Sequence, residues 1–322
     1  MQPLAPMEPK RGEIIPSGSD WIAQIKWDGV RLLTYYDGAR LQLFNRKKRE
    51  RTQHYPELTD IRNYCRAKSV ILDGEVIALG PDGKPSFHEV MRRDGIRRLE
   101  RVPRMRQLVP VTFMIFDLLY ADGSSLCRLP LHKRLELLET LVTPNECVQL
   151  VSSYADGVSL FNVMKENDME GIVMKQRESP YVAGTKSDRW LKIKNYHDLI
   201  AVIGGFTVRD QVVNALLLGL YDADGRLWYI GHAGTGKLSQ AEWRTLTALL
   251  HPTVTTEQPF ANRPERHRDA YWVRPTVAVK VTYIEWTPGG ALRQPSVQSV
   301  VDVPLRQCVF PGRDSPFNGY MT

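Results

Sequence analysis

The stretch Gln24-Ile25-Lys26-Trp27-Asp28-Gly29-Val30-Arg31 has the form Lys-x-Asp-Gly-x-Arg and decides how the chain around it is interpreted. The alternating run at residues 21–25 predicts a half-buried strand before it, and residues 30–36 predict a second strand after it. The Asp-Gly pair predicts a turn between these strands. Lys26 would then end a strand beside a glycine that lets a ligand approach the backbone, which makes it a candidate covalent nucleophile.

The chemistry of Lys26 depends on its surroundings. A lysine amine attacks well only when it is neutral, and burial or a nearby cation such as Arg31 would favour that form. On this motif alone, a surface hairpin with solvated Lys26, Asp28 and Arg31 is the more frequent alternative, because so short a pattern recurs by chance. Partner motifs further along the chain have to decide between the two interpretations.

Length and composition indicate a globular protein of about two domains. The chain has 322 residues, of which 43% are hydrophobic and 25% are charged, as is usual for globular proteins. Its net charge of +7 favours a polyanionic partner, nucleic acid first, although a basic protein without such a partner would show the same charge.

The cysteines and the apolar runs of the sequence indicate the cellular compartment in which we expect the protein. The four cysteines form no Cys-x-x-Cys pair and no zinc pattern, so we expect free thiols in a reducing environment. Residues 1–18 are rich in proline and predict an extended lead-in without the apolar core of a signal peptide. No apolar run approaches the roughly 18 residues of a membrane span. We therefore expect a soluble, cytoplasmic protein with no membrane partner.

Two predicted strands contain residues that point to a site. Residues 70–78 form an apolar run broken by Asp73-Gly74-Glu75, and charges inside such a strand are costly unless they face a site. Glu75 is therefore a functional candidate, with a satisfied edge-strand pair as the alternative. Phe116 lies in the apolar run at residues 111–119, where the pattern alone favours a core position over stacking on a base.

Basic side chains gather at three further places. Lys192 and Lys194 lie on one face of a predicted strand, where their charges repel unless an anion or solvent lies between them. The run Lys47-Lys48-Arg49 follows a strand that should end near Lys26. Residues 92–106 carry seven arginines: Arg92, Arg93, Arg97, Arg98, Arg101, Arg104 and Arg106. Both basic stretches are consistent with a solvated surface or with phosphate contacts.

The character of the chain changes after Lys194. Short apolar runs with tight turns follow, together with one helix at residues 239–250 that begins with a capping box. Several short strands with one helix predict a small barrel such as an OB-fold. We therefore expect two domains, residues 1–195 and residues 196–322, in an α+β protein.

The order of the motifs resembles one enzyme family. The motifs are Lys26-x-Asp28-Gly29-x-Arg31, Asn45-Arg46, Asp73-Gly74-Glu75, Phe116-Asp117, Glu170-Gly171 with Lys175, and Lys192-x-Lys194. This series is similar to that of the covalent nucleotidyltransferases, which comprise ATP-dependent DNA ligases, RNA ligases and mRNA capping enzymes. Residues 170–194, 204–207, 229–236 and 285–296 most resemble the DNA ligases, in particular the ligase module of bacterial end-joining ligases.

The resemblance implies a fold and an activity. Residues 1–195 would form a nucleotidyltransferase (adenylation) domain with antiparallel sheets and flanking helices, and residues 196–322 an OB-fold domain. The protein would be an ATP-dependent DNA ligase that seals nicks between a 3′-hydroxyl and a 5′-phosphate through a lysyl-AMP intermediate, in DNA repair or end joining. The alternatives are an RNA ligase or capping guanylyltransferase, and a non-catalytic nucleic-acid-binding module.

The resemblance also implies roles for individual residues. Lys26 would attack the α-phosphate of ATP. Glu75 would bind the ribose and Phe116 would stack on adenine. The other nucleotide contacts would come from Gln24, Ile25, Arg31, Arg46, Lys192 and Lys194. Glu170, with Glu75, would hold Mg²⁺ or Mn²⁺, and Arg293 would contact pyrophosphate. The expected partners are nicked double-stranded DNA and a Ku-like end-binding protein, with the enzyme itself a monomer.

Two positions depart from the family pattern. Gln24 stands where many relatives have a carboxylate that reads the exocyclic amine of adenine, although its amide oxygen can accept the same hydrogen bond. Residues 297–302 are mostly apolar or neutral where relatives continue with a basic tail that orients pyrophosphate. We therefore predict self-adenylylation that is slower than nick sealing by preformed enzyme-AMP.

Overall fold

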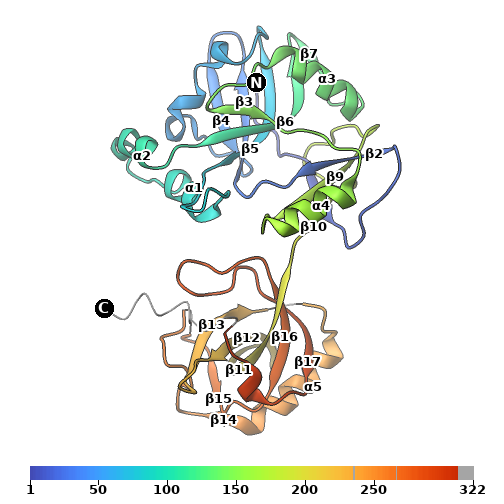
Figure 1. Cartoon of the computed structure of the whole chain (residues 1–322). Helices are drawn as coiled ribbons and strands as arrows, with labels where there is room; N and C mark the ends of the chain where they lie inside the picture. Colours follow the sequence, from blue (N-terminus) through green and yellow to red (C-terminus); the bar gives the residue numbers. More distant parts are fainter. Residues whose placement is uncertain (235, 266, 311–322) are drawn as a thin grey trace. The chain divides into compact units, whose positions relative to one another are not determined.

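The computed structural model describes residues 1–234, 236–265 and 267–310. The chain divides into two compact units, Met1–Asn195 and Tyr196–Thr322 (Figure 1). Thr235 of the glycine-rich motif at residues 229–236 and the last twelve residues of the expected second domain lie outside the described residues. Among the described residues, no helix is long and apolar enough to cross a membrane.

The larger sheet of the first unit has six strands in the order β4-β3-β5-β6-β7, with β8 beside β6. The strands are β3 (Val30–Tyr36), β4 (Leu41–Asn45), β5 (Val70–Ile77), β6 (Thr112–Ala121), β7 (Ser124–Ser125) and β8 (Val148–Leu150). Every pairing is antiparallel except that of β6 with β8. Helix α3 (Leu131–Leu141) packs against β6, and its buried Leu138 joins Leu72, Phe113 and Ile115 in one core.

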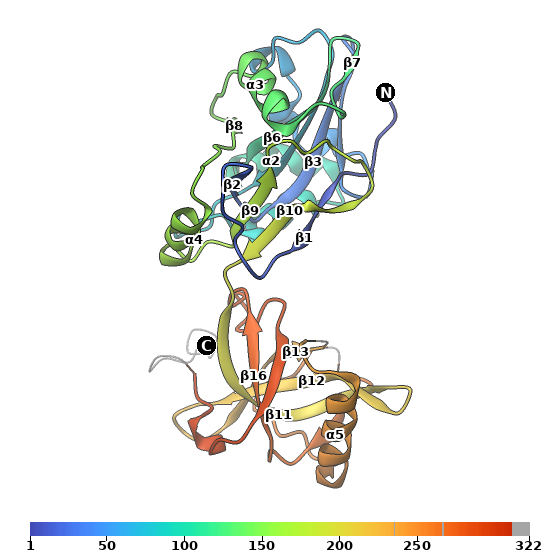
Figure 2. The same ribbon diagram turned by 90° about the vertical axis from the view of Figure 1, so that its right-hand side faces the viewer.

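The smaller sheet of the first unit has the order β1-β10-β9-β2 (Figure 2). Its strands are β1 (Glu8–Arg11), β2 (Trp21–Ile25), β9 (Gly171–Gln176) and β10 (Lys186–Lys194). Helix α4 (Gly157–Glu166) packs against β9 and β2. The lead-in is thus part of the fold: β1 pairs in parallel with β10, and Met7 just before it is fully buried.

Two short helices follow β5. The spacing of Ser86 and Glu89 is that of a capping box and predicts a helix start. Helix α1 (Phe87–Asp94) does begin there, and the Ser86 hydroxyl accepts a hydrogen bond from the Glu89 backbone N–H at 3.3 Å. A 3-10 turn, η4 (Leu99–Arg101), leads into α2 (Val102–Leu108). We call residues 87–108 the α1–α2 arm. Figure 1 shows it at the opposite end of the first unit from β7.

One expected helix of the first unit is wrong. The sequence of residues 56–66 predicts a short helix, but the structure has two 3-10 turns there, η2 (Pro56–Leu58) and η3 (Ile61–Asn63), preceded by η1 (Thr52–His54). Besides Cys65, the buried side chains of this segment are Tyr55, Leu58, Ile61 and Tyr64. Their spacing of three residues fits the 3-10 repeat rather than the 3.6-residue repeat of an α-helix.

The second unit is a curved sheet built on one long strand, β11 (His197–Arg209). The other strands are β12 (Val212–Tyr221), β13 (Leu227–Ala233), β14 (Val254–Thr255), β15 (Tyr271–Val273), β16 (Ala278–Tyr283) and β17 (Ser296–Val301). β11 pairs with β12 on one edge and with β15 and β16 on the other. A bridge between Gly234, after β13, and Ser296, at the start of β17, brings the two ends of the sheet together, as in a barrel.

One helix and two short turns complete the second unit. Helix α5 (Gln240–Leu250) packs against β12 and has the expected capping box between Ser239 and Glu242. The turns are η5 (His251–Thr253) and η6 (Leu305–Gln307). The core of the barrel contains Leu216, Leu218, Ile230 and Val279, all without exposed surface.

Candidate active site

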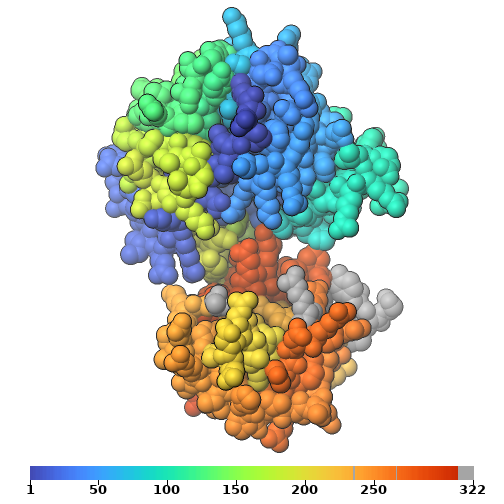
Figure 3. All heavy atoms as spheres, turned by 180° about the vertical axis from the view of Figure 1, so that it is seen from behind, coloured from blue at the N-terminus to red at the C-terminus, as the bar shows by residue number. Residues whose placement is uncertain are grey.

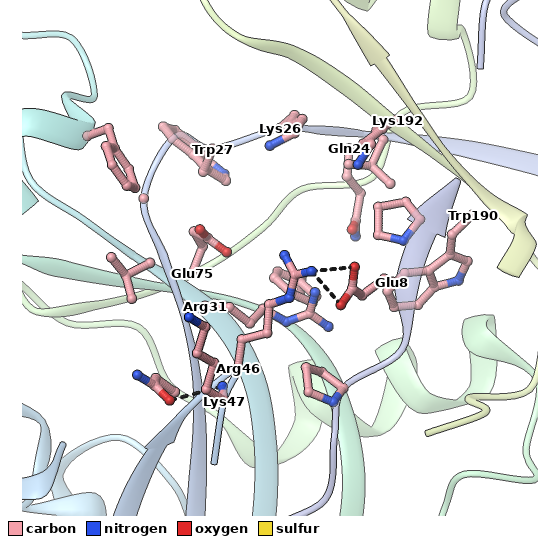
Figure 4. A pocket seen from close by; sticks show the side chains of 18 of the residues that line it. Glu8, Gln24, Lys26, Trp27, Arg31, Arg46, Lys47, Glu75, Trp190 and Lys192 are labelled. Carbon is pink, nitrogen blue, oxygen red and sulfur yellow. Dashed lines mark hydrogen bonds and ion pairs between the residues drawn. The ribbon is translucent and has the colours of Figure 1, made fainter. Parts of the chain in front are cut away.

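A pocket of about 900 Å³ lies in the first unit between its two sheets (Figure 4). The larger sheet contributes Arg31, Glu75 and Phe116 to its wall, and the smaller sheet contributes Gln24 and Lys192. The chain crosses between the sheets at Lys26 and Trp27, which also line the pocket. Ile25 and Arg46 complete the set of expected nucleotide contacts found in this wall, whereas Glu170 and Lys194 lie behind Lys26.

Lys26 is held in place through its backbone and its side chain. Its backbone N–H donates to the carbonyl of Gly171 at 2.9 Å, and its Nζ donates to Glu170 Oε2 at 2.7 Å. The other oxygen of Glu170 lies 3.0 Å from Lys194 Nζ. Burial alone would raise the pKa of Glu170, but the ammonium groups of Lys26 and Lys194 outweigh it and hold the pKa below its ordinary value. Glu170 therefore links Lys26 at the pocket wall to Lys194 behind it.

Two glycines allow this close approach of strands. Gly171 has φ +128°, and a Cβ there would clash with the carbonyl oxygen of Ile193. Gly29 lies against β5, where a Cβ would clash with the carbonyl oxygen of Val76 and approach Glu75 Cγ. A side chain at either position would push apart the segments that carry Lys26, Glu75 and Glu170.

Glu75 faces the same space as Lys26 (Figure 4). Burial raises the pKa of Glu75 to about 7, against the opposing effect of the Lys26 and Arg31 charges. Its carboxyl group therefore changes between the neutral and ionised forms near neutral pH. A carboxyl group in this state can accept hydrogen bonds from hydroxyl groups, and it can hold a cation once ionised.

Arg31 lines the pocket, but its guanidinium group is already bound. Nε and Nη2 each donate to one oxygen of the buried Asp73 at 2.5 Å, and Nη2 also donates to the carbonyl of Met7 at 3.2 Å. Tyr181 donates its hydroxyl to the same carboxylate at 2.7 Å. Arg31 therefore links β3, β5 and the lead-in, and any contact with a ligand would come in addition to this paired state.

Phe116 is half-buried at the pocket wall and carries two cations close to its ring. Arg31 Cζ lies 4.6 Å and Lys175 Nζ 4.4 Å from the ring centroid. Lys175 Nζ also lies 4.1 Å from the ring centroid of Trp190, whose ring is nearly perpendicular to that of Phe116. Burial lowers the pKa of Lys175 to about 7. These cation–π contacts fix the orientation of the Phe116 ring.

Two buried polar atoms of the pocket wall lack a hydrogen-bond partner within the described part of the chain. They are Gln24 Oε1 and Trp27 Nε1. Gln24 Nε2 donates to Ser153 Oγ at 3.1 Å, so the amide presents its oxygen to the pocket as an acceptor. A buried acceptor without a partner is costly. A ligand amine at this position would satisfy it.

The mouth of the pocket carries an ion pair and a lysine. Arg46, with 61% of its side chain exposed, lies 2.7 Å from Glu8 Oε1 (Figure 4). Lys192 has no ion pair among the residues that the structure describes, and burial, Lys194 and Lys26 together lower its pKa. A polyphosphate would meet both cations here.

The sequence did not assign a role to four residues of the site. Glu8 lies in the proline-rich lead-in, and Ser153 lies in a loop, where neither has a pattern of its own. Trp27 and Trp190 lie inside the motifs at residues 24–31 and 170–194, but no role was predicted for their side chains. Arg293, expected at a pyrophosphate, belongs to the second unit, where its Nη1 donates to Glu285 Oε1 at 2.7 Å.

Both units of the chain match known protein families. Residues 6–194 match the family described as ATP dependent DNA ligase domain, and residues 209–302 match the ATP dependent DNA ligase C terminal region. The fold and site thus define a covalent nucleotidyltransferase followed by an OB-fold domain. The chain belongs to the ATP-dependent DNA ligase family.

Individual relatives agree with this assignment. The multifunctional non-homologous end joining DNA repair protein LigD of Mycobacterium tuberculosis is 35% identical over 301 residues, which cover 91% of this chain and 38% of LigD. A DNA ligase of Thermococcus fumicolans is 30% identical over 88% of this chain and 52% of its own length. This chain therefore spans less than half the length of LigD and about half that of the archaeal enzyme.

Solved structures show the same architecture. Mycobacterial DNA ligase D complexed with ATP and MES is 31% identical, with a TM-score of 0.53 over 96% of this chain and 98% of that one. The ligase domain of M. tuberculosis LigD is 32% identical, with the same TM-score and coverage. The expected α+β fold, nucleotidyltransferase domain and OB-fold domain are confirmed.

Proposed function

We propose that this chain seals nicks in double-stranded DNA with ATP, through a lysyl-AMP intermediate on Lys26, in DNA repair or end joining. The observation that carries the proposal is the position of the Lys26 amine. It lies at the wall of a cationic pocket, bound to Glu170 at 2.7 Å and beside Glu75. A lysine nucleophile for a phosphate needs such positioning and charge stabilisation more than any further covalent chemistry.

In the proposed first step, Lys26 Nζ attacks the α-phosphorus of ATP. A nitrogen–phosphorus bond forms, the bond from the α-phosphorus to the bridging oxygen breaks, and pyrophosphate leaves. Nζ, an ammonium group in its pair with Glu170, must lose one proton to become a nucleophile and a second as the phosphoramidate forms. The Glu170 oxygen at 2.7 Å would accept the first and pass it to solvent, and solvent would take the second. Lys192 would face the phosphates from β10, where negative charge develops on the leaving group, and Lys194 would contact them after leaving Glu170.

In the proposed nucleotide complex, adenine lies between the ring of Phe116 and the smaller sheet. Gln24 Oε1 would accept a hydrogen bond from the exocyclic amine, which supplies the partner that this buried oxygen lacks among the described residues. Ile25 would contact the base from β2, and Glu75 would accept hydrogen bonds from the ribose hydroxyls. Arg46 would contact a phosphate after separating from Glu8, and Arg31 would support the site from its pair with Asp73.

The residues present also fit a divalent cation. Within the described ranges there is no group of three or more His, Cys, Asp or Glu side chains that could hold a metal ion on its own. Mg²⁺ commonly keeps several waters and takes one or two carboxylates together with substrate phosphates. Glu75, which lines the pocket, would hold Mg²⁺ or Mn²⁺ together with the phosphates, and Glu170 would join it once one of its oxygens leaves Lys26 or Lys194. The ion would neutralise phosphate charge.

In the proposed later steps, AMP passes from Lys26 to the 5′-phosphate of the nick, and a 3′-hydroxyl then displaces AMP and joins the strand. The LigD relative of Mycobacterium tuberculosis is named for non-homologous end joining, so we propose DNA ends as the physiological substrate. The proposal includes a monomer that acts with the nucleoid in the cytoplasm, and a Ku-like end-binding protein that brings the ends together.

The test is covalent labelling with ATP that carries the label on the α-phosphate. The unmutated chain should retain the label after denaturation, and Lys26→Arg, which keeps the charge next to Glu170, should not. Lys133→Arg is the matched control, because Lys133 lies on α3 and pairs there with Glu136. Labelled Lys26→Arg would exclude the proposed nucleophile.

Substrate choice is tested with the labelled enzyme. A singly nicked DNA duplex should be sealed, and the same duplex with a ribonucleotide at the 3′ side of the nick measures the preference for RNA ends. Preference for GTP, or sealing of RNA alone, would favour the RNA ligase or guanylyltransferase alternatives instead.

A further inference from the structure

The α1–α2 arm exposes a dense group of arginines. Between residues 92 and 106 all seven cationic side chains are arginine, with no lysine among them. Five of these arginines are exposed and have no ion-pair partner among the described residues: Arg97, Arg98, Arg101, Arg104 and Arg106. So many like charges in a short segment repel one another unless an anion lies against them. Arginine also matches phosphate geometry better than lysine does.

The other two arginines have different roles. Arg92 pairs with Glu89 on α1. Arg93 is fully buried and donates to the carbonyl of Val109 at 3.0 Å, to that of His54 at 2.8 Å and to Glu57. Since Arg93 lies in α1, Val109 follows α2, and His54 and Glu57 lie outside the arm, this one side chain ties α1 to the end of α2 and to the body of the unit. The five exposed arginines are therefore presented by an anchored element.

The anchoring continues at the next residue. Asp94 accepts hydrogen bonds from Arg51 Nε at 3.0 Å and from the Tyr55 hydroxyl at 3.1 Å. Arg101 and Arg104 are three residues apart and share one face of the helical segment. Val102, which points to the other face, is buried. Figure 3 shows residues 90–110, in teal, projecting from the side of the first unit.

The arm begins at the rim of the active-site pocket. Phe87, Met91 and Asp94 of α1 line the pocket together with the basic segment at Arg46, Lys47 and Arg49. Basic residues of the pocket wall therefore lie beside the start of the arm. A double helix whose nick lies at the pocket is far wider than the pocket, so its flanking backbone must lie against neighbouring surface.

We propose that the α1–α2 arm binds the phosphate backbone of the duplex on one side of the nick. This inference rests on the proposed function, because it takes nicked DNA as the substrate. The contacts are to phosphates and carry no sequence preference, so they fix where the duplex lies. An acidic protein surface is the competing occupant, and it would leave DNA affinity unaffected by changes in the arm.

The test is equilibrium binding of the full chain to a fluorescent nicked duplex over a range of salt concentrations. The variant Arg97→Ala/Arg101→Ala/Arg104→Ala removes three exposed charges from the arm. We expect its Kd to rise about tenfold or more near 100 mM salt, and the slope of log Kd against log salt to fall by about 2–3, since each phosphate contact contributes roughly one.

The matched control is Arg40→Ala/Arg66→Ala/Lys68→Ala, which removes the same number of exposed charges. These residues lie between β3 and β4 and before β5, at the end of the larger sheet opposite to the arm. The control should keep the Kd and slope of the unmutated chain within about twofold. Self-adenylylation with ATP, which involves no DNA, checks that both variants are folded.

The possible results test DNA binding by the arm separately from the proposed function of the chain. Unchanged DNA affinity in the arm variant would overturn the inference, and so would equal weakening in the control, because net charge alone would then explain it. Failure of the unmutated chain to form lysyl-AMP would count against the proposed function, whereas the binding comparison would still decide whether the arm contacts DNA.

Discussion

Lys175 shows how one residue of the site combines burial with charge. It is 3% exposed, lies against Phe116 and Trp190, and has its pKa lowered to about 7 by burial. In the unfolded chain its pKa returns to about 10.4. Between these two values the unfolded state binds more protons than the folded state does, so stability rises with pH across this window.

We predict that Lys175→Met removes this pH dependence. Between pH 7 and pH 10, the free energy of unfolding of the unmutated chain should rise relative to that of the variant, by at most about 1.4 kcal/mol per pH unit. Urea denaturation of both proteins at pH 6, 7, 8 and 9 measures the difference. Lys133→Met, an exposed position on α3, is the control. If the difference in unfolding free energy between the unmutated chain and Lys175→Met stays constant over this pH range, the lowered pKa of Lys175 is contradicted.

Glu8 occupies space near the cations that the proposed function assigns to phosphates. Its carboxylate pairs with Arg46 at 2.7 Å and contributes favourably to the charge of Lys192. Arg46 is largely exposed, and an exposed pair of this kind contributes only about 0–1 kcal/mol. A phosphate can therefore displace Glu8 from Arg46 at small cost.

We predict that Glu8→Gln lowers the KM for ATP in self-adenylylation by about twofold to fivefold, because Arg46 no longer has to leave an anionic partner. Asp188→Asn, which removes the same charge from an exposed pair with Lys10 on the same sheet, should leave the KM unchanged. A higher KM in Glu8→Gln would show instead that the carboxylate helps to hold the nucleotide complex.

At the scale of elements, the start of β9 fixes the position of Lys26. Lys26 N–H bonds to the carbonyl of Gly171, and Glu170, one residue earlier, bonds to Lys26 Nζ. Gly171 adopts φ +128°, and the carbonyl of Ile193 fills the space where a Cβ would lie. The turn into β9 therefore requires glycine for two reasons, conformation and space.

We predict that Gly171→Ala slows self-adenylylation by at least about tenfold, because the shifted turn moves Glu170 away from Lys26. Gly123→Ala is the control, because it tests the backbone conformation without a steric clash. Gly123 also has a positive φ, of +91°, but no atom lies within 4 Å of its Cβ position. The control should lose some stability and keep its rate of labelling. Equal rates in the two variants would show that the fit at Gly171 does not position the site.

Local patterns predicted most elements and not their partners. The alternation around Lys26 and Lys192 gave the correct strands, and the Ser86 and Ser239 capping patterns gave the correct helix starts. The pairing of β1 with β10 joins segments more than 170 residues apart, which no local pattern encodes. Glu8 and Ser153 enter the site only through such pairings, so their roles could not be predicted from their neighbours in sequence.

At the scale of the whole molecule, the described pocket belongs to the first unit, and Arg293 is the site candidate from the second. The segment after Arg293 forms β17, which pairs with β16. Val297 is fully buried, and Gln298 donates to Thr282 Oγ1 at 2.9 Å. Val297 is therefore needed to build the barrel, whereas Val300 in the same segment is exposed.

The composition of residues 297–302 predicts a slow first step. Negative charge develops on pyrophosphate as it leaves, and loss of one group that stabilises such charge commonly costs about 10²–10³ in rate. Arg293 remains, with Glu285 as an ion-pair partner at 2.7 Å. We predict that single-turnover self-adenylylation is at least about tenfold slower than sealing of a nick by preformed lysyl-AMP enzyme.

The same argument assigns Arg293 to the first step only. Arg293→Ala should slow self-adenylylation further and leave sealing by preformed lysyl-AMP enzyme within about threefold, because pyrophosphate has already left in the later steps. Arg306→Ala, at an exposed position of η6, should change neither rate. Quenched-flow measurement of both steps with labelled ATP and a labelled nick decides the matter. A first step faster than sealing would show that the barrel needs no basic tail to expel pyrophosphate.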